Sequence, residues 1–281
     1  MDAKTSVLLE DLCFPEGPRW RGDRLWFSDM HDRRVRTVDL AGRSEALFEV
    51  PGSPSGLGWL PDGRLLVVSM SDRRLLRLDP DGLALHADLS GLASHDCNDM
   101  VTDAHGRSYV GNFGFDLHTQ AQPRFAEIVL VSPEGDARVV AREMRFPNGT
   151  VITEDGRTLV VGESTGARLT AFDIAEDGSL GSRRVWAQLE GAVPDGICLD
   201  AEGAIWVASP LGNEVLRVRE GGAVTHRVTA SSRAIACMLG GPERRHLFVC
   251  TASAMAPEAC RETRPGRIEV AEVDVPGAGF P

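Results

Sequence analysis

The chain repeats one strand-rich unit six times, and this repetition restricts its possible folds more than any other feature. A run of strand-type residues recurs as LWFS at 25, LLVVS at 65, SYVGN at 108, LVVGE at 159, IWVAS at 205 and LFVCT at 247. Five of these six runs follow a turn that contains Gly or Asp, and a second strand-like run follows each of them. The units recur about every 40–50 residues, which with several strands per unit is typical of a β-propeller.

The six units predict an all-β fold, a six-bladed β-propeller with four antiparallel strands per blade, formed by one domain over residues 1–281. Most units contain a fourth, outer strand, such as EALFEV at 45 or ARVVAREM at 137, but the last unit has none. The unpaired run SVLLED at 6–11 is therefore predicted to complete the last blade and close the ring, which removes an exposed edge. A pair of β-sandwiches is the alternative fold.

The starts of the units align, and the same position in most of them carries an oxygen donor. The starts read FPEGPRW, SPSGLGW, DCNDMVT, FPNGTVI, VPDGICL and RAIACML. Their third residues are Glu16, Ser55, Asn98, Asn148, Asp195 and, in the last unit, Ile235 or Ala234. In a propeller the innermost strand of each blade lines the central channel. We therefore expect four of these side chains to form a ring at one mouth of the channel: Glu16, Asn98, Asn148 and Asp195.

Such a ring, with two carboxylates and two amides, predicts a metal site. Buried like charges are costly unless a cation relieves them. Oxygen ligands suit one hard or borderline divalent ion, Ca²⁺, Mg²⁺, Mn²⁺, Zn²⁺ or Fe²⁺, and no other cofactor is expected. Pro-Asn-Gly and Pro-Asp-Gly also form ordinary turns, but a turn does not explain why the residue between Pro and Gly is a metal-capable donor.

The motifs FPEGPRW, LWFSD, CNDMVTD, FPNG and VPDGICLD resemble the gluconolactonase/regucalcin (senescence marker protein) family over nearly the whole chain. The resemblance implies a six-bladed propeller with one catalytic divalent metal in the channel. It implies that Glu16, Asn148 and Asp195 are the metal ligands, that Asp195 is the general base, and that Asn98 contacts the substrate or a metal-bound water. The implied reaction is hydrolysis of a lactone, in which the metal polarises the ring carbonyl and activates water.

The substrate is less clearly indicated than the reaction. Sugar-lactone members of the family carry an Arg two residues before the Asn, whereas this chain has Asp96, which puts a gluconate-type substrate in doubt. Long loops at 112–125 and 251–266 carry Phe113, Phe115, His118 and Met255, and these favour a less polar substrate than a free sugar. The alternative is that Phe113 and Phe115 only pack the base of their loop. Asp96 and these four residues are the predicted substrate contacts, together with Asn98.

Composition excludes several partners. The net charge of −11 argues against nucleic acid, and no apolar run approaches the ~20 residues of a membrane span. No signal-peptide pattern opens the chain, and the six cysteines form no C-x-x-C pair, so we expect reduced thiols in a cytoplasmic protein. The expected partner is a small-molecule substrate, and the expected state is a monomer or small homo-oligomer.

Other functions stay open at the sequence level. GESTG at 162–166 matches the serine-hydrolase pattern, but a strand-like run follows it where that motif needs a helix, so Ser164 is not expected to be a nucleophile. The same metal site is compatible with hydrolysis of another ester or a phosphotriester, or with a metal-assisted cyclase or isomerase. A calcium-binding propeller without turnover is a further alternative.

Overall fold

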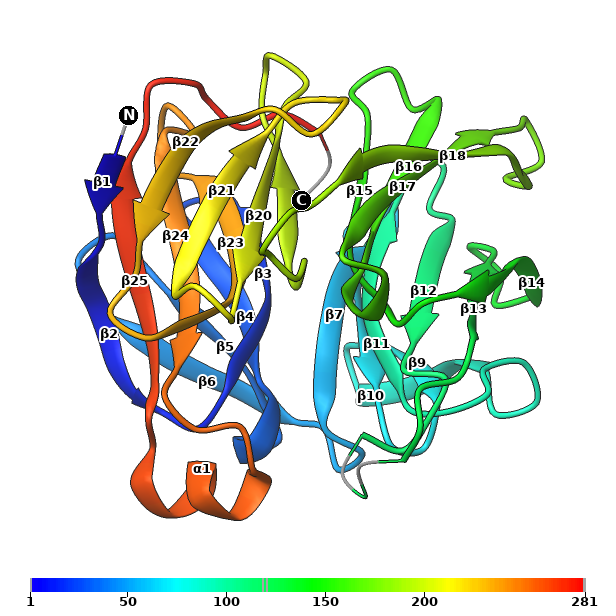
Figure 1. The fold of residues 1–281 in the computed structure, drawn as a ribbon. Helices are drawn as coiled ribbons and strands as arrows, with labels where there is room; N and C mark the ends of the chain where they lie inside the picture. The colour runs from blue at the N-terminus through cyan, green and yellow to red at the C-terminus, as the bar shows by residue number, and fades with distance from the viewer. Residues whose placement is uncertain (1, 118, 120, 280–281) are drawn as a thin grey trace.

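The structure, a computed structural model that describes residues 2–117, 119 and 121–279, consists of six sheets around a central channel (Figure 1). The first strand of each blade packs against the first strands of its two neighbours, and the cycle β3, β7, β11, β15, β19, β23 closes on β3. Each of these sheets has four antiparallel strands or, in one case, five strands. The predicted six-bladed propeller is confirmed.

The first three blades follow the chain in order from the channel outward. Blade 1 contains β3 (Pro15–Arg21), β4 (Arg24–Asp29), β5 (Arg34–Val38) and β6 (Ser44–Glu49). Blade 2 contains β7 (Pro54–Trp59), β8 (Leu65–Ser69), β9 (Arg74–Asp79) and β10 (Gly82–Asp88). Blade 3 contains β11 (Cys97–Thr102), β12 (Ser108–Asn112), β13 (Ala126–Val131) and β14 (Ala137–Met144).

The last three blades include both ends of the propeller ring. Blade 4 contains β15 (Pro147–Ile152), β16 (Thr158–Glu163), β17 (Arg168–Ile174) and β18 (Leu180–Gln188). Blade 5 contains β19 (Ile197–Leu199), β20 (Ile205–Ser209), β21 (Glu214–Val218), β22 (Val224–Thr229) and, at its edge, β1 (Asp2–Lys4). Blade 6 contains β23 (Arg233–Gly240), β24 (His246–Ala252), β25 (Gly266–Glu272) and β2 (Ser6–Leu12).

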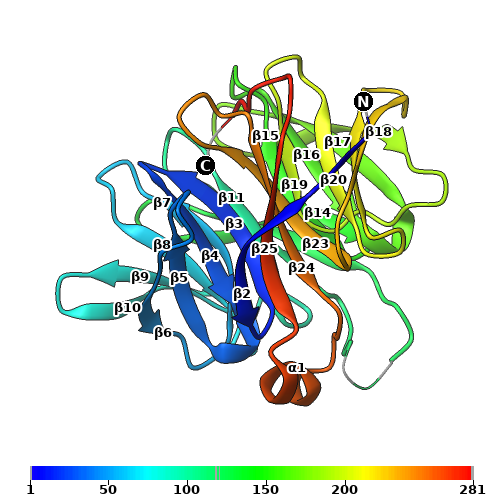
Figure 2. The ribbon, with the colours of Figure 1, turned by 90° about the vertical axis from the view of Figure 1, so that its left-hand side faces the viewer.

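The N-terminal segment closes the ring, as the sequence predicts. Strand β2 pairs antiparallel with β25, and Figure 2 shows the two strands side by side. The sequence analysis missed β1, which adds a fifth, parallel strand to blade 5 beside β22. Its three residues are too few to show an alternating pattern. The same segment therefore ties blade 5 to blade 6.

The second strand of each blade is buried on both faces because a neighbouring blade covers each face. Every residue of β8, β12 and β20 is buried. This explains why the recurring runs read as continuous apolar stretches instead of alternating ones. The sequence gives no sign of one short helix, α1 (Pro257–Thr263), which lies within the expected loop at 251–266 and has Pro at its first turn. Within the described part of the chain, no helix has the length and hydrophobicity needed to cross a membrane.

Deleting residues 1–12 is expected to lower the thermal unfolding midpoint by roughly 10 °C or more and to cause self-association. The deletion exposes the edge of β25, and it removes Thr5, whose hydroxyl donates to the buried carboxylate of Glu269. Thermal unfolding and light scattering after size exclusion measure both effects. Deleting only residues 1–4 removes β1 but keeps β2, and it should leave the oligomeric state unchanged and the midpoint within a few degrees of wild type. An unchanged midpoint for the longer deletion would contradict the closure.

Candidate functional site

The four oxygen donors meet in one cavity at a mouth of the channel. The cavity has a volume of about 230 Å³, and its lining includes Glu16, Asn98, Asn148 and Asp195. The first three are the second residues of β3, β11 and β15, and Asp195 lies two residues before β19. Equivalent positions of four blades therefore contribute to the same site.

A repeated backbone irregularity places these side chains. Pairing between the first and second strands shifts register just at the donor, between Glu16 and Arg19 in blade 1 and between Pro147 and Thr150 in blade 4. The equivalent shifts in blades 2 and 3 begin at Pro54 and Cys97. Such bulges bend a strand and redirect its side chains. The donors of β3, β11 and β15 thus lie in bulged strands, whereas Asp195 lies in the irregular segment before β19.

The glycine that follows each of two donors permits close contact between blades. A Cβ atom on Gly149 would lie 2.4 Å from the backbone nitrogen of Ile197 in the next blade. On Gly17, which has a φ of +55°, a Cβ atom would lie 2.6 Å from the carbonyl oxygen of Ser55. A side chain at either position would push neighbouring inner strands apart. The Gly in these motifs therefore brings the donors together.

The cavity base is electrostatically negative. Burial raises the pKa of Glu16 well above its usual range, and the nearby charges of Asp195 and Asp99 add to this effect. Burial also raises the pKa of Asp195 to about 7, although a hydrogen bond from Asn148 opposes the shift. Both shifts reflect the cost of placing uncompensated carboxylates together out of water. A bound cation would remove that cost.

One buried atom at the cavity base lacks a partner. Among the described residues, the side-chain oxygen Oδ1 of Asn148 is buried without a hydrogen bond, while its Nδ2 donates to Oγ of Ser164 at 3.3 Å. Orphaned buried acceptors are rare in folded proteins. This oxygen and the carboxylates of Glu16 and Asp195 fit a hard divalent cation. The described residues contain no group of three or more His, Cys, Asp or Glu side chains suited to a metal, so the amide oxygen is needed.

Asn98 is held in a fixed orientation beside these groups. Its Oδ1 accepts from Oγ of Ser55 at 3.5 Å, and its Nδ2 donates to the carbonyl of Pro147 at 3.3 Å. Both contacts come from neighbouring inner strands. The amide therefore faces the cavity with its rotamer set by the flanking blades.

The structure brings some of the predicted substrate contacts to this cavity and not others. Phe113 and Met255 line it. Phe115 packs edge-on against Phe146 at 5.7 Å and is not among the described lining residues. Asp96 also lies outside the lining, with Oδ1 at 3.3 Å from Nδ1 of His95. His118 lies outside the described residues.

Two repeated positions in the sequence mark lining residues, most of which were not predicted as substrate contacts. The residue directly after the second strand lines the cavity in five blades, and these residues are Met30, Met70, Phe113, Ser164 and Pro210. The residue two positions before a donor lines it in three blades, and these are Phe14, Phe146 and Val193. Asp96 occupies this second position in blade 3. The other lining residues that were not predicted as substrate contacts are His31 and Leu117.

Two potential nucleophiles near the donors are structural. Ser164 begins the short helix η2 (Ser164–Gly166), donates to the carbonyl of Pro194 at 2.7 Å, and is followed by strand β17. This setting differs from the strand–turn–helix of serine hydrolases. Cys97 is fully buried, and burial raises the pKa of its thiol to about 12, so it stays a packed thiol.

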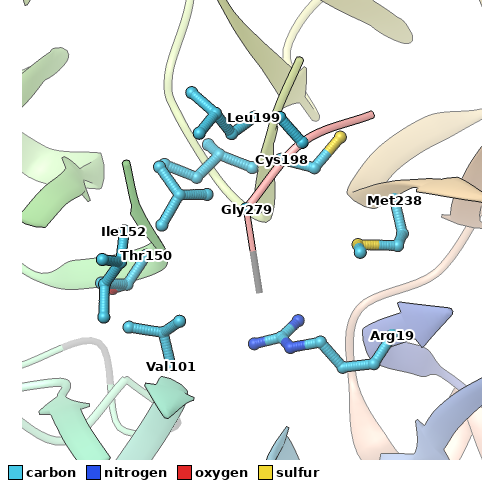
Figure 3. Close-up of a pocket in the computed structure, with 11 residues that line it drawn as sticks. Arg19, Val101, Thr150, Ile152, Cys198, Leu199, Met238 and Gly279 are labelled. Atoms are coloured by element: carbon cyan, nitrogen blue, oxygen red, sulfur yellow. The ribbon is translucent and has the colours of Figure 1, made fainter. Parts of the chain in front are cut away.

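The opposite end of the channel is nearly filled. Figure 3 shows Arg19 pointing into a pocket there, which Met238, Leu199 and the C-terminal segment at Gly279 also line. The space left there is about 10 Å³, enough for about one water molecule. A ligand of the donors would therefore enter through the mouth on their own side.

Comparisons with known proteins find relatives of this chain in sequence and in fold. A 6-deoxy-6-sulfogluconolactonase from Pseudomonas putida is 26% identical over 287 residues, which cover 98% of this chain and 96% of that protein. Regucalcin from Danio rerio is 28% identical over 162 residues, 55% of this chain and 54% of regucalcin. The structure of a calcium-binding protein, regucalcin, from Agrobacterium tumefaciens superposes with a TM-score of 0.84 at 23% identity, covering 100% of this chain and 98% of the other.

A profile of the SMP-30/Gluconolactonase/LRE-like region matches residues 14–253. This range starts just before β3, ends just after β24, and includes all four channel donors. The resemblance recognised in the sequence is thereby confirmed, and the chain belongs to the SMP-30/gluconolactonase/LRE-like family.

Proposed function

We propose that the protein hydrolyses a lactone with a divalent cation held in the central channel by Glu16, Asn148 and Asp195. The observation that carries this proposal is the partnerless Oδ1 of Asn148 beside two buried carboxylates at the base of a cavity. The name of the Pseudomonas putida relative, a sulfogluconolactonase, supports lactone opening. The solved relative is called a calcium-binding protein, so Ca²⁺ is the first ion to test.

The chain's own residues have distinct roles in this reaction. When bound, the cation supplies Lewis-acid polarisation of the lactone carbonyl. Asp195 accepts a proton as the water oxygen bonds to the carbonyl carbon, and it returns the proton to the ring oxygen when the ring C–O bond breaks. The product is a hydroxy acid, and the atoms of one water are added. Asn98 orients the substrate or the attacking water through its fixed amide.

Removal of the metal is expected to lower lactone hydrolysis by at least about a hundredfold, and one divalent ion should restore it. The measurement is elemental analysis of the purified protein, followed by assay after chelation and after separate addition of Ca²⁺, Zn²⁺, Mn²⁺, Mg²⁺ and Fe²⁺. The panel contains aldonolactones, aliphatic γ- and δ-lactones and an aromatic lactone. A phosphotriester and an aryl ester test the other hydrolase chemistries.

Ser55→Ala is the matched control for the site because Ser55 occupies the equivalent position in blade 2 and lies outside the proposed ligand set. This variant should keep its full metal content. Hydrolysis that survives complete metal removal would contradict the proposal. Metal binding near one ion per chain without opening of any lactone or ester would instead favour a cyclase, an isomerase or a calcium-binding protein.

A further inference from the structure

The wall of the cavity above the donors is mostly apolar. Of its fifteen described lining residues, nine are apolar, and aromatic rings and methionines dominate them. Phe113 and Phe146 pack edge to face with centroids 4.8 Å apart. No Arg or Lys occurs among the described lining residues. The site therefore offers a hydrophobic surface close to a polar base.

The polar lining groups outside the proposed ligand set already have protein partners. Ser164 donates to Pro194 and accepts from Asn148, and Asn98 is bonded on both sides of its amide. The ring of His31 packs against Phe14 at 4.9 Å. A polyhydroxylated substrate would lose water on entering and find few new hydrogen bonds, which is unfavourable.

The mouth of the cavity extends this apolar surface outward. Leu117 and Met255 both line the cavity, yet they are 40% and 45% exposed. Large apolar side chains that stay exposed at the rim of a cavity are typical of ligand-binding surfaces. A substituent of the ligand that extends from the donors toward the mouth would cover Leu117 and Met255.

We infer that the substrate is a lactone whose substituent is a hydroxyl-poor alkyl or aryl group, not an aldonolactone. The lactone carbonyl lies toward Glu16, Asn148 and Asp195, and the substituent contacts Phe113, Phe146 and Met255. This inference rests on the proposed function, because it names the substrate class of the same site.

The test compares the metal-loaded protein on γ-butyrolactones that carry methyl, propyl and hexyl groups at the γ-carbon and on glucono-δ-lactone. We expect kcat/KM to rise about fourfold per added methylene until the chain reaches the mouth, with the aldonolactone the poorest substrate. Met255→Gln should lower kcat/KM for the hexyl lactone about fivefold, and it should lower kcat/KM for the methyl lactone less. Leu85→Gln, an exposed leucine on the outer strand β10, is the control and should change neither value.

Binding of non-hydrolysable γ-alkyl butyrolactams, measured by calorimetry, separates this inference from the proposed reaction. If no lactone is opened but lactam affinity rises with chain length, the apolar substituent site stands and the proposed hydrolysis fails. Preference for the aldonolactone, or rates independent of chain length, would overturn the inference and leave the proposed hydrolysis intact. Absence of lactam binding together with absence of turnover would overturn both.

Discussion

Replacing Asp195 by Asn is expected to reduce lactone hydrolysis by roughly a thousandfold or more. The substitution keeps the size and an oxygen of the side chain, but it removes both the proton acceptor and one of the two negative charges at the cavity base. Asp195 is 9% exposed, and Glu16 is the one other carboxylate among the described lining residues of the cavity. Steady-state rates at saturating metal, together with metal content, measure the effect.

The expected pattern across variants separates two roles of this residue. Glu16→Gln should weaken metal binding, and high metal concentrations should recover part of its activity. Asp195→Asn should stay slow at any metal concentration because the proton acceptor is missing. If Asp195→Asn regains the wild-type rate at high metal concentration, Asp195 serves only as a metal ligand. Thermal unfolding of both variants checks that the fold is retained.

The repeated sequence pattern was enough to predict the blades, the ring closure and the convergence of four donors. Each unit buries its second strand between two neighbouring blades, so an apolar run recurs at a regular spacing along the chain. Glu16 and Asn148 could be found because equivalent positions of a ring must meet at its axis. The fifth strand β1 could not be found, since three residues carry no period.

The substrate side of the site was predicted less well. Phe113 and Met255 were found because they lie in long loops, whereas Met30, Met70 and Pro210 were missed although they occupy one repeated position after the second strand. Alignment of the residue that directly follows the second strand of each blade would have found them. The placement of Asp96 beside His95 depends on the local path of the chain before β11, and no repeat specifies it.

Arg19 and Asp99 form a buried ion pair between the inner strands of two blades. Nη2 of Arg19 in blade 1 lies 2.7 Å from Oδ1 of Asp99 in blade 3, and the two residues are 6% and 3% exposed. The same guanidinium also donates to the carbonyl oxygens of Pro18 and Met100. Blades 1 and 3 are not neighbours, because β7 lies between their inner strands. The pair thus links two inner strands on either side of blade 2, close to the donors Glu16 and Asn98.

Arg19→Met is expected to lower the free energy of unfolding by about 3–5 kcal/mol, because it leaves Asp99 charged and buried without its partner. The loss is aggravated by Glu16 and Asp195, the two buried carboxylates whose pKa values Asp99 already raises. Urea unfolding of the metal-free protein measures the change. Asp99→Leu should lower the free energy of unfolding by a similar amount, because it leaves the guanidinium of Arg19 buried without its carboxylate partner.

The double variant Arg19→Met with Asp99→Leu should recover most of the stability that either single change removes. Replacing both members of a buried ion pair by apolar groups is often neutral, since neither charge then has to be desolvated. The coupling energy from the double-mutant cycle is therefore expected to be large and to favour the intact pair. Additive losses in the cycle would instead mean that water solvates the two charges separately. In that case strand packing alone would stabilise the inner ring, and the donors would keep their positions without the ion pair of Arg19 and Asp99.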